Sequence, residues 1–170
     1  MKHSITTGFS FGSTSGVITT LGLMVGLHSG THSKMAVLGG ILTIAIADAF
    51  SDALGIHISE ESENTHTQAE IWVATISTFI AKFIVALTFV VPILLWEFSK
   101  TFTIPLTDIT MPIAILVAVA WGLLLITMVS LRMAKAQGSK ASHVILEHVI
   151  IVIVVIFISH FVGDWSRTLG

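Results

Sequence analysis

The chain contains no cysteine among its 170 residues. Disulfide bonds, thiolate metal sites and cysteine nucleophiles are therefore excluded, and a metal site would need oxygen ligands, imidazoles or methionine. Charged residues are also scarce, at 11% of the chain, and the formal net charge is −2. Since no basic patch is available for nucleic acid, we expect no nucleic-acid partner.

The motifs of common enzymes are missing as well. The sequence has no serine–histidine–aspartate order of a hydrolase, no glycine-rich phosphate loop and no zinc-protease helix motif. The eight histidines lie mostly at the ends of expected helices or in loops. We therefore expect that the protein is not an enzyme and that it holds no permanently bound cofactor.

Hydrophobic residues make up 54% of the chain, and the mean hydropathy is +0.94. This balance is typical of an integral membrane protein. Five apolar stretches approach the ~20 residues needed to cross a hydrocarbon core of about 30 Å, at residues 9–27, 35–58, 71–96, 111–133 and 144–162. Because the connectors are short, the sequence predicts an all-α protein with one transmembrane domain over residues 1–170.

The lysines and arginines of the short loops suggest an orientation. Four lie at the expected end of the N-terminus and three at the other end, and loops rich in such residues tend to stay in the cytoplasm. The N-terminus is therefore predicted to be cytoplasmic. The two sets are Lys2, Arg132, Lys135 and Lys140 against Lys34, Lys100 and Arg167.

Two carboxylates interrupt the second apolar stretch near its middle. Asp48 and Asp52 are four residues apart, so they share one helix face. An acidic side chain at the centre of a spanning helix costs roughly 2.5–3.5 kcal/mol on insertion scales and by default indicates function. A central cation site is the functional interpretation.

Lys82 lies close to the midpoint of the third apolar stretch. It is too far from either membrane surface to reach water easily, so it should have an acidic partner. Asp48 or Asp52, at a similar depth on the neighbouring helix, is the expected partner. Lys82 would then act as counter-ion and in proton coupling.

Several polar side chains could complete such a site. Ser15 and Thr19 on the first stretch and Ser51 on the second are candidate oxygen ligands. The acidic segment at residues 59–70 is either a solvated loop or a funnel that concentrates cations at the cytoplasmic mouth of a path. The mouth residues are His57, Glu60, Glu61 and Glu63.

Two segments resemble a known family. The run TSGVITTLGLMVGL at residues 14–27 resembles the first-helix signature of the vacuolar iron transporter family, and ADAFSDALGIHISEESE at residues 47–63 resembles its second-helix signature. The likeness continues through residues 83–96 and 160–165. It implies a five-helix homodimer in the lipid bilayer, with a path between or within protomers, that exports a divalent metal ion from the cytoplasm in exchange for protons.

The sequence departs from that family at three places. The metal-path aspartate of the first helix falls on Ser15, and the methionine of the second helix falls on Asp52. The long glutamate-rich extension of some members is reduced to residues 59–70. Asp48 matches the family's aspartate, and Lys82 matches no motif residue. Loss of the thioether favours hard oxygen-preferring ions of the Fe²⁺ and Mn²⁺ type.

Two other interpretations stay open. Asp48, Asp52 and Lys82 could form a structural buried ion pair that fixes helix register in a non-transporting scaffold. The chain could also be an accessory subunit of another complex, in which case it would co-purify with a partner.

Overall fold

The computed structural model describes residues 1–98, 100–103 and 110–169. It is helical apart from one short antiparallel hairpin in which Thr101 pairs with Pro112. The elements are α1 (Lys2–Thr31), α2 (Lys34–Thr43), a π-helical turn η1 (Ile44–Asp48), α3 (Ala49–Ser62), α4 (Gln68–Thr88), α5 (Val90–Leu95), β1 (Thr101–Thr103), β2 (Thr110–Pro112), α6 (Ile113–Gln137) and α7 (Ala141–Arg167).

Five helical segments are long and apolar enough to cross a membrane, as the sequence predicts. They are Lys2–Thr31, Lys34–Ser62, Gln68–Leu95, Ile113–Gln137 and Ala141–Arg167. Their helical ends extend past the apolar runs because hydropathy marks only the oily part of a helix. The expected loop at residues 59–70 is correspondingly shorter, since α3 continues to Ser62 and α4 begins at Gln68.

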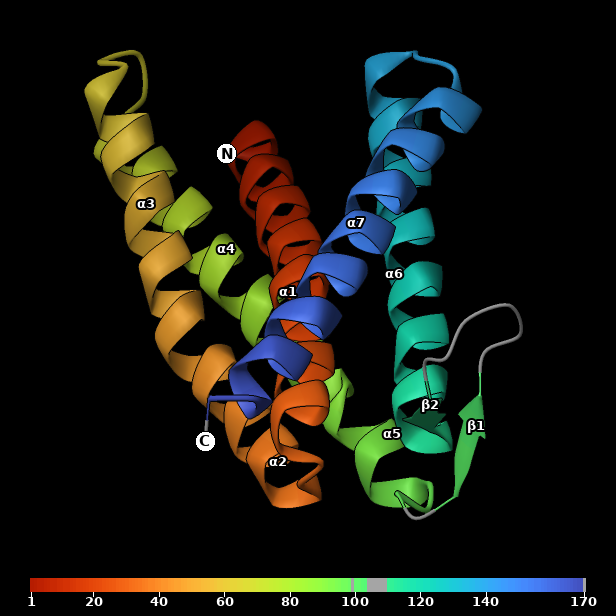
Figure 1. Cartoon of the computed structure of the whole chain (residues 1–170). Coiled ribbons are helices and arrows are strands. Elements are labelled where there is room, and N and C mark those ends of the chain that lie inside the picture. Colours follow the sequence, from red (N-terminus) through yellow and green to blue (C-terminus); the bar gives the residue numbers. More distant parts are fainter. Residues whose placement is uncertain (99, 104–109, 170) are drawn as a thin grey trace.

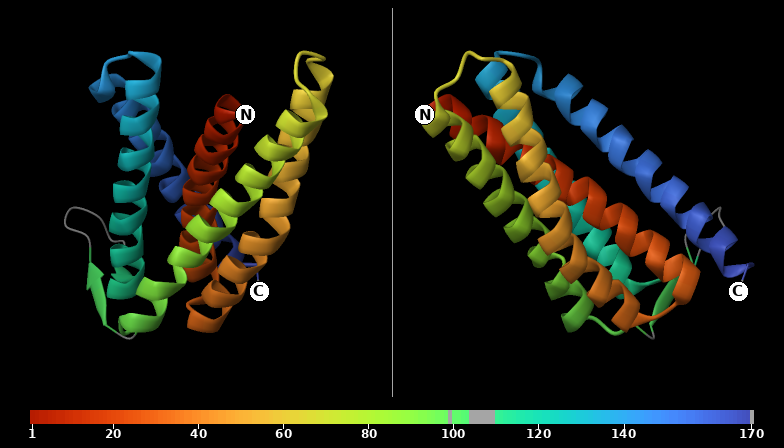
Figure 2. Two further views of the ribbon diagram at one scale, coloured as in Figure 1. Left: turned by 180° about the vertical axis from the view of Figure 1, so that it is seen from behind. Right: turned by 90° about the vertical axis from the view of Figure 1, so that its left-hand side faces the viewer.

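The helix α1 lies between two helix pairs. The α3 and α4 helices flank it on one side and α6 and α7 on the other, and the two pairs diverge towards the end that holds the N-terminus (Figure 1; Figure 2). The most extensive packing of α1 is with α4 and α7. The two termini lie at opposite ends of the molecule (Figure 1), because the chain runs along its length five times, once in each long helical segment.

Glycines allow α1 to approach its neighbours closely. A Cβ added at Gly12 would overlap the carbonyl oxygen of Thr78 on α4, and one at Gly22 would meet Val155 on α7 at 2.9 Å. Small residues at these positions let the helix backbones approach closely.

Local sequence explains where several helices begin and end. The Ser33 hydroxyl caps α2 by accepting a hydrogen bond from the Ala36 amide at 3.2 Å. Thr67 and Glu70 form a capping box at the start of α4. Gly138 ends α6 with φ 65°, a left-handed conformation that glycine adopts without strain.

The third predicted helix, residues 71–96, is interrupted. Helix α4 ends at Thr88 and α5 begins at Val90. Pro92 explains the break, because proline cannot donate a hydrogen bond to the carbonyl four residues earlier and its ring clashes with that carbonyl. The fourth helix begins at Ile113 instead of residue 111, since Met111 and Pro112 belong to β2.

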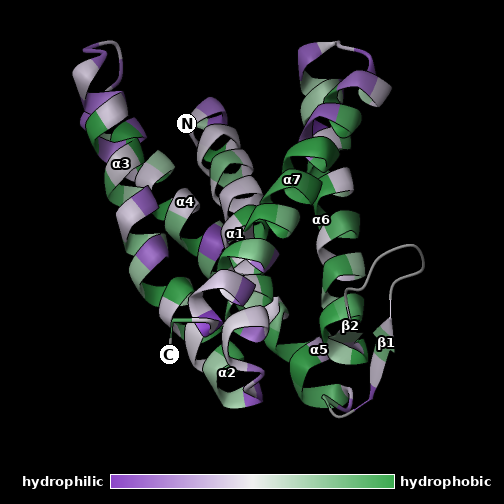
Figure 3. Cartoon of the chain, in the orientation of Figure 1, coloured by the Kyte–Doolittle hydropathy of each residue, from purple (hydrophilic) through white to green (hydrophobic). Residues whose placement is uncertain are grey.

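Hydrophilic residues gather at the upper helix ends and around the start of α2, whereas α5 and the outward faces of α6 and α7 are mostly hydrophobic (Figure 3). A further hydrophilic band crosses α3 at about mid-height (Figure 3). In α7 the buried residues are Val152, His160 and Gly163, and exposed apolar side chains such as Ile150 and Phe157 cover much of the rest. This pattern suits an apolar surrounding.

Candidate functional site

Three side chains from two neighbouring helical segments surround the ammonium of Lys82. Its ammonium lies 2.5 Å from Oδ2 of Asp48, 2.5 Å from Oδ2 of Asp52 and 2.9 Å from Oγ of Ser15. Asp48 is the central residue of the Lys34–Ser62 segment, and Lys82 is near the centre of Gln68–Leu95. The sequence-predicted partnership of the lysine with both aspartates is therefore present.

The two carboxylates are bound differently. Lys82 donates hydrogen bonds to Asp52 and to Ser15. Its contact with Asp48 is an ion pair that lacks hydrogen-bond geometry, and the buried Oδ2 of Asp48 accepts no hydrogen bond among the described residues. Asp48 is therefore held by the charge of the ammonium alone, and its side chain is the more exposed of the two carboxylates.

Burial differs as well within this group, which we call the Lys82 trio (Asp48, Asp52 and Lys82). The Lys82 side chain is fully buried, whereas the side chains of Asp48 and Asp52 are 32% and 19% exposed. When all three are ionised the trio carries one net negative charge. In a medium of low dielectric such an excess charge is unfavourable, and an additional cation beside the carboxylates would offset it.

The backbone is irregular where it meets the trio. The π-helical turn η1 runs from Ile44 to Asp48, directly before α3, whose first turn contains Asp52. Such turns are rare and frequently occur at functional sites. The extra residue in the turn changes the helical phase, so the face that follows Asp48 is rotated relative to α2.

Two predicted oxygen ligands are not part of this group. The Thr19 hydroxyl donates to the backbone carbonyl of Ser15 at 2.9 Å, on its own helix. Ser51 is exposed on α3, beside the carboxylates in sequence. The structure thus brings Ser15 to the trio and leaves Thr19 and Ser51 outside it.

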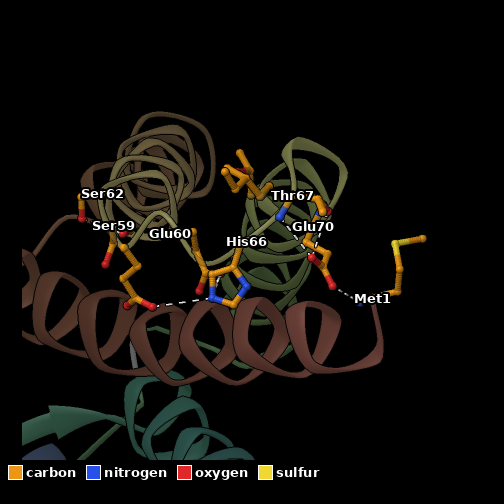
Figure 4. A network of polar contacts seen from close by, with 10 residues as sticks. Met1, Ser59, Glu60, Ser62, His66, Thr67 and Glu70 are labelled. Carbon is orange, nitrogen blue, oxygen red and sulfur yellow. Dashed lines mark hydrogen bonds and ion pairs between the residues drawn. The ribbon is translucent and has the colours of Figure 1, made fainter.

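The predicted mouth residues lie at the far end of α3, away from the trio. The imidazole of His66 is 3.4 Å from Glu60 and 3.6 Å from Glu63, and Glu60 is nearly buried beside it (Figure 4). Glu61 is exposed. His57 instead contacts Thr75 at 3.0 Å.

The N-terminus lies at this same end of the molecule. The Met1 ammonium pairs with Glu70 at 3.0 Å (Figure 4). Because Glu70 is in the first turn of α4, the starts of α1 and α4 meet here, next to the acidic C-terminal end of α3. Acidic groups therefore gather at this end of the molecule.

A second polar cluster lies at the opposite end, in a cavity of about 170 Å³. His160 on α7 contacts the Ser29 hydroxyl at 2.5 Å and Asp164 at 3.4 Å. His28 and His32 stack beside it with ring centres 5.1 Å apart. The four-residue spacing of His160 and Asp164 in the sequence indicates that these two side chains lie together on one face of α7. Nothing in the sequence indicates that the end of α1 packs against them.

Within residues 1–98, 100–103 and 110–169, no three histidine, aspartate or glutamate side chains converge as a complete metal site. The trio offers two carboxylates, so a bound cation would need further oxygen ligands from Ser15, from water or from another chain. Compared with family models, with curated proteins and with solved structures, the chain matches none of them. The site must therefore be interpreted from its own chemistry.

Proposed function

We propose that the protein is an integral membrane transporter that exports divalent cations of the Fe²⁺ or Mn²⁺ type from the cytoplasm in exchange for protons. The observation that carries the proposal is the composition of the Lys82 trio. A structural ion pair needs one carboxylate for one ammonium, but here a second carboxylate lies at the centre of a long apolar segment. The excess charge favours binding of a proton or a metal ion.

Exchange follows from competition for the same oxygens. In the empty state Lys82 neutralises one carboxylate and a proton can neutralise the other. A metal ion entering the site displaces the ammonium towards Ser15 and binds Asp48 and Asp52 together. Protonation of the carboxylates from the opposite side releases the metal, because one site cannot hold both. Carboxylate and hydroxyl oxygens suit hard divalent ions.

A second copy of the chain would complete the site. Small side chains at intervals of four residues form an exposed stripe on the second segment, next to the partly exposed carboxylates. We call it the small-residue stripe: Gly39, Thr43, Ala47, Ser51 and Gly55. Such stripes let helices approach closely in lipid, and a homodimer packed there would shield the carboxylates and place the path between protomers.

The resemblance to the vacuolar iron transporter family, which includes Asp48 and the first-helix run at residues 14–27, supports the same proposal. The short α3–α4 connector would make this chain a divergent member without a long cytoplasmic metal-binding extension. Cations would enter past the acidic end of α3, with the N-terminus in the cytoplasm.

The complete burial of Lys82 favours a second candidate, a scaffold or accessory subunit in which the trio is static. Buried ion pairs are weak contributors to stability but are damaging to break. This candidate predicts variants that fail to assemble, whereas the transporter predicts folded variants that no longer transport.

The test is uptake of Mn²⁺ and Fe²⁺ into proteoliposomes under a proton gradient. We expect Asp48→Asn, which keeps the Asp52–Lys82 pair, to abolish uptake while the protein stays folded. A matched control is Glu97→Gln, which removes an exposed carboxylate paired with Lys100 and should transport as wild type does. Uptake by Asp48→Asn equal to that of wild type would refute the site assignment.

A further inference from the structure

A groove lies between the start of α1 and the C-terminal end of α6. These two helix ends lie at the end of the molecule where the helix pairs diverge (Figure 1). Its volume is about 670 Å³, and it is lined from α1 by residues such as His3, Thr6 and Ser10 and from α6 by Arg132 and Gln137. A second cavity of about 210 Å³ continues it towards the middle of the molecule and shares Phe9, Val129 and Arg132 with it.

The lining changes character along this path. Imidazole, hydroxyl, amide and guanidinium groups line the outer part, together with apolar side chains. The inner part is lined almost entirely by apolar side chains, including Val17, Val85, Leu125 and Met128. The groove is therefore amphipathic, with its polar part at the end of the molecule and its apolar part inside.

Arg132 is the charged group at the junction of the two parts. It forms no ion pair with an acidic side chain of the described residues, and its guanidinium lies 6.0 Å from the centre of the Phe9 ring. It is close to the C-terminal end of α6, a depth from which a long side chain reaches the membrane interface. A fixed cation here repels metal ions, so this groove is unsuited to be the cation path.

We infer that the groove binds an anionic phospholipid, with the phosphate on Arg132 and an acyl chain along Phe9, Leu125 and Met128. An arginine fork binds phosphate oxygens in pairs, and basic pockets between spanning helices at the cytoplasmic face are suited to lipid headgroups. The inference rests on the membrane location in the proposed function and is independent of metal transport.

The first test is native mass spectrometry of the purified full chain with phosphatidylglycerol or phosphatidylcholine. We expect wild type to retain phosphatidylglycerol in preference, and Arg132→Gln to bind it roughly tenfold more weakly, as loss of a charge-assisted hydrogen bond to phosphate implies. Lys135→Gln is the matched control, because Lys135 is an exposed neighbour on α6 outside the groove lining. Inorganic phosphate should not displace the lipid.

Equal retention of the lipid by Arg132→Gln, or an equal loss in Lys135→Gln, would overturn the inference, the latter because it would indicate general surface attraction. A second measurement keeps Arg132 intact. Ser10→Cys places the single thiol of the chain in the groove, and its maleimide labelling should slow with phosphatidylglycerol but not with phosphatidylcholine. Protection that depends on protein concentration and not on lipid would instead assign the groove to a second copy.

Discussion

At the scale of single residues, Asp48 and Asp52 are bonded differently to Lys82. Substitutions in the trio should therefore separate effects on transport from effects on the stability of the fold. Asp52 accepts a hydrogen bond from Lys82, whereas Oδ2 of Asp48 accepts none among the described residues. Removing the Asp48 charge leaves a neutral Asp52–Lys82 pair. Removing the Lys82 charge leaves two carboxylates with no cation beside them. The loss of the Lys82 charge should therefore destabilise the folded protein far more than the loss of the Asp48 charge.

We predict that Asp48→Asn changes the free energy of unfolding in detergent by less than about 1 kcal/mol. Lys82→Met should lower it by about 3–5 kcal/mol, the usual cost of removing one partner of a buried ion pair. Asp48→Asn should nevertheless stop metal uptake. Thermal unfolding and proteoliposome uptake on the same preparations measure both effects. If Asp48→Asn destabilises the protein as much as Lys82→Met does, the trio is structural.

The trio could be predicted from the sequence because charges in apolar stretches are conspicuous and must be paired. The hydroxyl ligands could be predicted only in part. Ser15 reaches Lys82, but Thr19 hydrogen-bonds to its own helix and Ser51 faces outward. Which side of a helix faces its neighbours depends on packing, and a hydroxyl that can satisfy itself on its own backbone gives no signal in the sequence.

At the scale of helices, close packing of α1 on α4 holds Ser15 next to Lys82. We predict that Gly12→Ala lowers the free energy of unfolding by about 1–3 kcal/mol, as overpacking typically does, because the new methyl group would overlap the Thr78 carbonyl. Gly39→Ala is the matched control when both variants are measured as monomers, because Gly39 belongs to the small-residue stripe proposed as the dimer contact. It has open space within 4 Å and should be neutral or stabilise the helix by up to about 1 kcal/mol.

Chemical unfolding in detergent micelles measures this pair of variants. Equal stability of Gly12→Ala and Gly39→Ala would mean that α1 and α4 are not in contact at this point. A transport measurement on Gly12→Ala should also show reduced uptake, since displacement of α1 withdraws Ser15 from the site.

The number and order of the long helices could be predicted because each needs an uninterrupted apolar run. Their ends could not, since polar residues continue a helix beyond the apolar part, as Thr31 and Ser62 do. The π-helical turn before Ala49 has no sequence signature of its own. The β1–β2 hairpin was likewise not predicted, because its strands are only three residues long.

At the scale of the whole molecule, the partly exposed carboxylates require a covering surface. A bilayer is a poor surrounding for Asp48, with 32% of its side chain exposed. The small-residue stripe lies alongside, and Gly55 within it has no atom within 4 Å of an added Cβ. In a two-fold symmetric dimer, residues on the axis contact their own copies. A second copy packed on this stripe would bring both Lys82 trios to one interface.

We predict that Ser51→Cys forms a disulfide-linked dimer on mild oxidation in the membrane. The chain has no native cysteine, so each variant carries a single thiol and the crosslink is unambiguous. Ile150→Cys, exposed on α7 in the other helix pair, is the control and should stay monomeric on a denaturing gel. Crosslinking of Ile150→Cys without Ser51→Cys would place the dimer contact on α7, leave Asp48 facing lipid, and remove the support for a path between protomers.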